Sequence, residues 1–121
     1  MDRFGQPFRD YRPALEALRK SRGTGPEWTR HPIKDMNIPT VAEMVTILDR
    51  IDTIMRDGCA YVHCWGGKGR TGTVIGCWPA RYGGNGLALL KELTADRFEL
   101  FGEIPQTDEQ RAFVRNWRAG Q

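Results

Sequence analysis

Residues 63–72, with the sequence HCWGGKGRTG, constrain the fold of this chain more than any other segment. They follow an apolar run at residues 60–63 that is typical of a buried strand, and they precede an apolar segment with helical periodicity. Glycines at positions 66, 67 and 69 permit a tight turn whose backbone N–H groups point inward and bind an anion. The segment therefore predicts a strand, an anion-binding loop, and a helix whose N-terminus faces the anion.

Two side chains of this loop can carry out chemistry on a bound phosphate. Cys64 lies at the rim of the loop, where the helix dipole, the loop amides and Arg70 all favour the thiolate. The guanidinium of Arg70 can bind two phosphate oxygens at once. We expect the hydroxyl of Thr71 to donate to the sulfur, and we expect His63 to order the loop by bonding to its backbone. A thiolate in line with a bound phosphate is an activated nucleophile.

The loop resembles the His-Cys-x-x-Gly-x-x-Arg-Thr-Gly signature of the protein tyrosine and dual-specificity phosphatases, in their compact prokaryotic form. This resemblance implies hydrolysis of phosphotyrosine, and also of phosphoserine or phosphothreonine, through a thiol-phosphate intermediate on Cys64. An ATP-binding loop is excluded, because no Ser or Thr follows the lysine. The alternative without catalysis is a core cysteine beside a glycine-rich turn. The substrate-binding residues that the resemblance implies are Trp65, Gly66, Gly67, Lys68, Gly69 and Arg70.

The leaving oxygen of a phosphomonoester needs a proton, which in this family comes from an aspartate on a loop upstream of the cysteine. Residues 31–39, HPIKDMNIP, resemble that loop and imply that Asp35 is the general acid. The alternative is that Asp35 is a solvated carboxylate or a turn former before Pro39.

Residues 106–110, QTDEQ, resemble the loop whose glutamines position the hydrolytic water in the large tyrosine phosphatases. The resemblance implies this role for Gln110, with Gln106 in support. The same residues also form a capping box from Thr107 to Gln110, which any helix start can use. Both interpretations can hold together.

The substrate class has two further alternatives. The first is a phosphoinositide or sugar-phosphate substrate, because Lys68 within the loop is a feature shared with phosphoinositide phosphatases. The second is that the chain binds phosphate without catalysis. Trp65 favours an aromatic or apolar contact with substrate, or else it packs beneath the loop.

The remaining patterns predict a single domain over residues 1–121 with an α/β fold, a small central sheet flanked by helices. The family usually begins with one more strand, so we expect a sheet shortened at its N-terminal side. Capping residues at Thr40, Asn85 and Thr107 mark three helix starts. The predicted helices are 12–22 (Leu15 and Leu18 inward), 40–57, 70–82, 85–98 and 107–119, and the predicted strands are 27–33 and 60–63.

Composition and charge limit the location, the cofactors and the partners that we expect for this chain. Its 121 residues carry a formal net charge of +3 without a run of five like charges, which predicts no nucleic-acid tail. The three cysteines do not show the spacing of a disulfide framework, and the sequence has neither an apolar leader nor an apolar stretch of 18 residues. These features predict a cytoplasmic chain with no membrane span. The two histidines lack metal-ligand spacing, so we expect neither metal nor cofactor. The expected partner is a phosphorylated protein or a small phosphomonoester.

Overall fold

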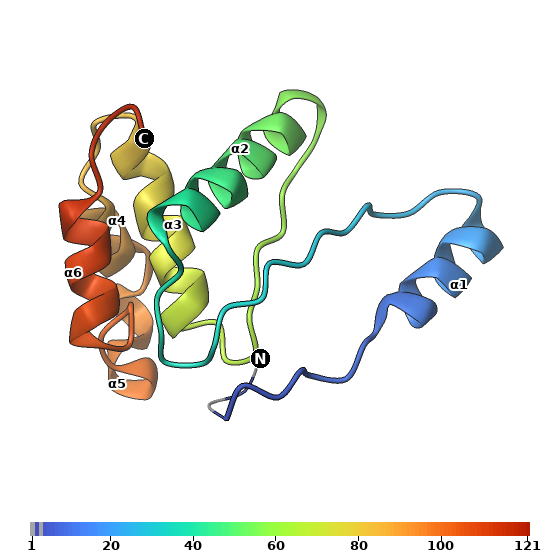
Figure 1. Ribbon diagram of the computed structural model, residues 1–121, viewed down its shortest axis with the longest axis horizontal. Helices are drawn as coiled ribbons and strands as arrows, with labels where there is room; N and C mark the ends of the chain where they lie inside the picture. Colours follow the sequence, from blue (N-terminus) through green and yellow to red (C-terminus); the bar gives the residue numbers. More distant parts are fainter. Residues whose placement is uncertain (1, 3) are drawn as a thin grey trace.

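The computed structural model describes residue 2 and residues 4–121, with the side chains of Phe98 and Phe101 left out, and its described residues form helices and loops without a strand (Figure 1). The prediction of an α/β fold with a central sheet is therefore wrong. The helices are α1 (Arg12–Arg22), α2 (Val41–Asp57), α3 (Gly69–Arg81), α4 (Gly86–Leu93), η1 (Ala95–Arg97, a 3-10 turn), α5 (Phe98–Phe101) and α6 (Asp108–Asn116).

Both predicted strands are extended but do not pair with a neighbour through backbone hydrogen bonds anywhere in the described part of the chain. In residues 27–33, two acceptors bind side chains of the helices instead. The carbonyl of Ile33 accepts from Arg70, and the hydroxyl of Thr29 accepts from Arg50. Pro32 also has no N–H to contribute to a ladder. A period-two pattern predicts extended backbone, but a strand also requires a partner, and here the segment before residue 27 forms α1 rather than a first strand.

Helix α3 lies at the centre of the folded body and packs against α2, α4 and α6. At one contact the glycines of two helices touch, because a Cβ built on Gly86 would lie 1.9 Å from the carbonyl oxygen of Gly76. This close approach and the apolar core fix α3, and with it the loop at its N-terminus. The buried apolar side chains are Met44, Ile47, Leu48, Ile51, Val74, Cys77, Ala80, Leu90, Val114 and Trp117.

The predicted caps are present at three helix starts. Thr40 and Glu43 form a reciprocal capping box on α2, as do Thr107 and Gln110 on α6. The side chain of Asn85 accepts from the backbone of α4. The segment predicted as one helix over 85–98 is α4 followed by η1, with α5 beginning at residue 98, and α6 ends three residues before the predicted limit.

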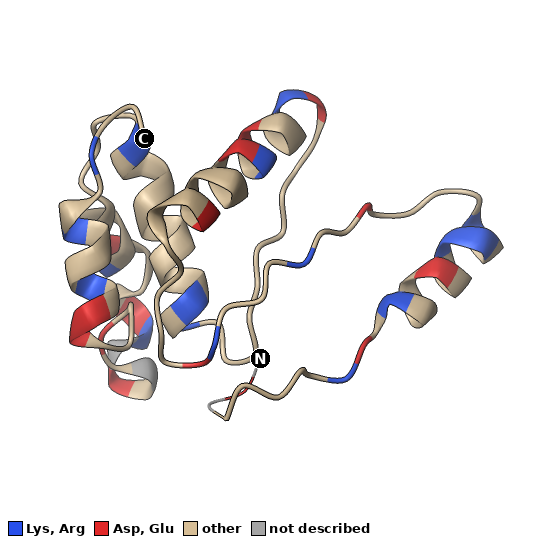
Figure 2. Ribbon diagram, in the orientation of Figure 1, with Lys and Arg blue, Asp and Glu red and all other residues tan. Residues whose placement is uncertain are grey.

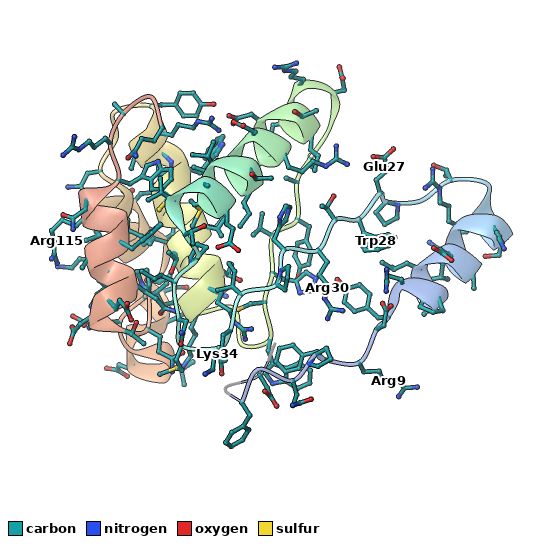
Figure 3. The ribbon with its side chains drawn as sticks, in the orientation of Figure 1. Arg9, Glu27, Trp28, Arg30, Lys34 and Arg115 are labelled. Atoms are coloured by element: carbon teal, nitrogen blue, oxygen red, sulfur yellow. The ribbon has the colours of Figure 1, made fainter. Side chains whose placement is uncertain are left out.

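Helix α1 stands apart from the other helices and contacts none of them (Figure 1). Its predicted inward face is not buried, since Leu18 is 52% exposed. Basic residues are frequent along it (Figure 2). The extended segment that follows carries Glu27 and Trp28 (Figure 3), and Glu27 forms an ion pair with Arg50 of α2 at 3.1 Å. Within the described residues, no helix has the length and apolar character to cross a membrane.

Candidate active site

The cysteine loop connects residues 59–63 to the first turn of α3, so the predicted helix after the loop is present, whereas the predicted strand before it is not formed. The backbone N–H of Gly67 donates to the Sγ of Cys64 at 3.2 Å. Gly67 has φ +71°, which only glycine adopts without strain, so this residue allows the chain to turn back over the sulfur. The thiol therefore lies inside the curve of the loop rather than in a packed core.

The surroundings of Cys64 favour its thiolate. Partial burial of the thiol acts to raise its pKa, but several groups outweigh burial and the pKa is lowered below its ordinary value. These groups are the hydroxyl and amide of Thr71, the amide of Gly67 and the positive charge of Arg70. The Thr71 hydroxyl is buried, and among the described residues no other partner competes with the sulfur for its hydrogen bond. Nucleophilic cysteines require this kind of environment.

Arg70 links the cysteine loop to the loop that carries Asp35. Its Nη1 donates to the carbonyl of Ile33 at 3.1 Å, and its Nη2 lies 3.0 Å from the Oδ1 of Asp35. The arginine side chain is 8% exposed, whereas Asp35 is 39% exposed. The guanidinium is thus held at the base of the site, with a carboxylate on the side that faces solvent. The structure brings Asp35 to the predicted site, although the two residues lie 35 positions apart.

The N-terminal segment brings the aromatic ring of Phe8 to the same place, where it meets Trp65 of the cysteine loop. Phe8 stacks on Trp65 with ring centroids 5.1 Å apart and planes inclined by 15°. The guanidinium carbon of Arg70 lies 5.5 Å from the centroid of the Phe8 ring. Trp65 is 79% exposed, so it does not pack beneath the loop. An aromatic surface therefore borders the arginine, and sequence analysis missed Phe8 because an isolated aromatic in an extended segment carries no signal of its long-range contact.

His63 bonds to the loop backbone, as its sequence position predicts. Its Nδ1 lies 3.1 Å from the carbonyl oxygen of Cys64, which can only accept, so Nδ1 carries the proton and Nε2 accepts from the hydroxyl of Tyr11 at 2.8 Å in the neutral ring. Tyr11 is the second site residue that the sequence did not indicate.

The two predicted glutamines lie in different environments. Gln106 is exposed, and its backbone carbonyl accepts from the side chain of Arg111. Gln110 is fully buried next to Gly69, and both polar atoms of its amide are bonded within the chain. A role of either residue in positioning water stays a prediction.

The other thiols of the chain differ from Cys64. Burial raises the pKa of Cys77 to about 12, so this residue is an unreactive part of the core. Cys59 is exposed, and its thiol is not part of a disulfide bond. Across the described residues no group of three or more histidine, cysteine and acidic side chains is placed to hold a metal ion.

Comparison with known proteins agrees with the resemblance seen in the loop. Residues 15–84 match the family described as DSP-PTPase phosphatase of polymorphic toxin systems. Two uncharacterized proteins of Methanocaldococcus jannaschii are also similar. MJ0215 is 40% identical over 84 residues, which is 69% of this chain and 50% of that protein, and MJECL20 is 35% identical over 88 residues, 71% and 56% respectively. The chain thus spans about half the length of these curated relatives. No solved structure matches it.

Proposed function

We propose, since the chain belongs to the DSP-PTPase phosphatase family of polymorphic toxin systems, that it hydrolyses aryl phosphomonoesters such as phosphotyrosine through a thiol-phosphate intermediate on Cys64. The observation that carries the proposal is the position of Cys64. Its sulfur accepts from the amide of Gly67, its pKa is lowered despite partial burial, and Arg70 follows six residues later in the first turn of α3. A thiolate and a guanidinium around an anion-binding loop are the parts that phosphoryl transfer to sulfur requires.

In the first step, the Sγ of Cys64 forms a bond to phosphorus while the bond from phosphorus to the leaving oxygen breaks. The amides of the loop and the fork of Arg70 stabilise the charge on the non-bridging oxygens. Asp35 gives its proton to the leaving oxygen, so that the alcohol or phenol departs neutral. The hydroxyl of Thr71 stabilises negative charge on the sulfur.

In the second step, water attacks phosphorus and the sulfur–phosphorus bond breaks. Asp35, now ionised, takes the proton of the attacking water, which returns the carboxylic acid to its starting form. The products are inorganic phosphate and the Cys64 thiolate, so atoms and charges balance without metal or cofactor.

The aromatic surface of Phe8 and Trp65 supports an aryl substrate. The stacked pair lies beside Arg70, so a phosphate bound to the guanidinium has an aromatic wall next to its ester oxygen. Stacking of aromatic rings contributes about 0.5–1.5 kcal/mol beyond the burial of area, which corresponds to roughly 2- to 10-fold in kcat/KM. An alkyl phosphate such as phosphoserine gains little from this wall.

The test is hydrolysis of p-nitrophenyl phosphate by the wild type and by Cys64→Ser, in EDTA, across pH 4.5 to 8. We expect turnover in the wild type that is absent in the variant. A wild type that binds phosphate but does not turn over would support a phosphate-binding module instead, and turnover that persists in Cys64→Ser would remove the thiolate mechanism.

The substrate class is tested by comparing a phosphotyrosine peptide, a phosphoserine peptide and inositol phosphates. Phe8→Leu keeps an apolar side chain and removes the ring, so it should lower kcat/KM for phosphotyrosine and leave phosphoserine unchanged. Phe4→Leu is the matched control, because the same change occurs in the same segment on a ring that is 73% exposed. A preference for inositol phosphates over phosphotyrosine would contradict the aryl assignment.

A further inference from the structure

The side chain of Gln110 lies in an environment that a helix-capping residue does not need. In a capping box the third residue of the helix reaches back to the N-cap backbone from the surface. The Oε1 of Gln110 does accept from the backbone N–H of Thr107 at 3.1 Å, yet the residue is 0% exposed. Burying a primary amide is costly unless all its groups are bonded, so a fully buried Gln110 indicates a second partner.

The second partner is the loop that carries Asp35. The Nε2 of Gln110 donates to the carbonyl oxygen of Asn37 at 3.1 Å, across 73 positions of sequence. On its other side the amide lies against the first residue of α3, since a Cβ built on Gly69 would be 2.9 Å from both Nε2 and Oε1. One amide therefore touches the Asp35 loop and the residue directly before Arg70.

The loop at this point has a strained turn. The N–H of Asn37 donates to the carbonyl of Lys34 at 3.2 Å, which closes a turn with Asp35 and Met36 in its centre. Met36 has φ +66°, the left-handed region that a side chain disfavours by roughly 1–2 kcal/mol. Such a conformation persists where neighbouring contacts fix it. The bond from Gln110 to Asn37 is next to the strained residue, and the ion pair from Arg70 holds the other central residue.

We infer that Gln110 is a positioning residue that fixes the Asp35 loop against the start of α3 and so keeps the Asp35 carboxyl at the leaving-group side of the phosphate site. This inference rests on the proposed function, because it assigns Asp35 the role of general acid. It differs from a role in placing water, because the amide of Gln110 acts through the carbonyl of Asn37 and not on the reacting atoms.

The kinetic test uses Gln110→Met, which keeps the length and volume of the side chain and removes both hydrogen bonds. The control is Arg115→Met, which places the same residue on the outer side of α6 (Figure 3). The assay measures kcat/KM for p-nitrophenyl phosphate, a good leaving group, and for phenyl phosphate, a poor one that depends on the acid. We expect a loss of about 10-fold on phenyl phosphate and at most about 2-fold on p-nitrophenyl phosphate, since a misplaced catalytic group costs one to two orders of magnitude.

A double-mutant cycle separates positioning from mere stability. If Gln110 acts through Asp35, Gln110→Met has no further effect on phenyl phosphate in an Asp35→Asn background. Equal losses on both substrates, or losses that multiply in the double variant, would overturn the inference. A role in placing water alone predicts neither outcome, because kcat/KM covers the steps up to formation of the thiol-phosphate, whereas the water attacks afterwards and would limit kcat.

A second measurement needs no turnover and so distinguishes failure of this inference from failure of the proposed function. Amide hydrogen exchange is compared at residues 35–38 in Gln110→Met and Arg115→Met, with thermal melting to establish that both are folded. We expect exchange at the turn to be at least about 10-fold faster in Gln110→Met only, because the turn loses a partly buried hydrogen bond that fixes it against Gln110. Unchanged exchange overturns the positioning role even in an active enzyme.

Discussion

Replacement of Gly86 by alanine tests whether the helix packing that positions the cysteine loop is as close as the structure shows. The new Cβ would lie 1.9 Å from the carbonyl oxygen of Gly76, whereas ordinary contacts begin at 3.4 Å, so α3 and α4 must separate by about 1.5 Å. A gap of 0.5–1 Å already forfeits about a quarter to a half of the dispersion energy of a contact. Leu90, which is 4% exposed, would lose most of its packing on α3.

Full burial of a leucine contributes about 1.5–3 kcal/mol, and overpacking adds roughly 1–3 kcal/mol, so Gly86→Ala should destabilise the protein by about 3 kcal/mol or more. The assay is urea unfolding followed by circular dichroism. The control is Gly58→Ala, where the new Cβ would lie 3.8 Å from its nearest neighbour and φ is −170°, so its stability should change by less than about 0.5 kcal/mol. Equal unfolding midpoints for the two variants would refute the close approach of α3 and α4.

Three further predictions concern the charged groups. Thr71→Val should shift alkylation of Cys64 by iodoacetamide to higher pH, because the hydroxyl helps to lower the pKa of the thiol; an unchanged pH profile would contradict this. Arg70→Lys should lower kcat on p-nitrophenyl phosphate far more than it weakens phosphate binding, since an ammonium keeps the charge but loses the fork; equal effects on both would argue against bidentate binding. Burial raises the pKa of Asp52, but hydrogen bonds and Arg81 lower it by more. The ionised carboxylate of Asp52 therefore stabilises the fold above about pH 4, and this contribution is lost as the pH falls further. Urea unfolding at pH 7 and at pH 3 measures it: the free energy of unfolding should change less between the two pH values in Asp52→Asn than in the wild type.

Local signals in the sequence were sufficient to predict most helix starts. The capping residues Thr40, Asn85 and Thr107 each bond to backbone within three positions, so their effect does not depend on the rest of the fold. Burial is a different matter, because it depends on what packs against a helix. The pattern of α1 predicts a helix correctly, but no other helix contacts it and none of its residues is buried.

The sheet was predicted wrongly because strands are defined by partners that a local pattern cannot supply. Residues 60–63 were predicted as a buried strand, but they form no strand and Tyr61 and His63 are exposed, while Val62 packs against the core. Their backbone groups nevertheless do not pair with another segment within the described residues. The positions of the helices that the segment connects, and not a ladder of hydrogen bonds, place the cysteine loop.

The site divides in the same way. Cys64, Gly67 and Arg70 lie within seven residues, so their spacing alone predicts the loop around the sulfur. The contacts of Phe8 with Trp65 and of Gln110 with Asn37 join distant segments, and nothing in the local sequence signals them. Asp35 could be predicted only through the family resemblance.

The ion pair between Asp35 and Arg70 has a consequence for the order of events at the proposed active site. Without a ligand, the carboxylate lies 3.0 Å from the guanidinium that is proposed to bind phosphate. A phosphate dianion carries more charge and offers a bidentate face, so it competes for Arg70 against a carboxylate that is 39% exposed. Once a phosphate holds the guanidinium, Asp35 has lost its positive partner. Binding of the substrate and release of Asp35 from its ion pair are thus coupled through Arg70, and a monoanionic diester, which competes less well for the guanidinium, should be a poor substrate.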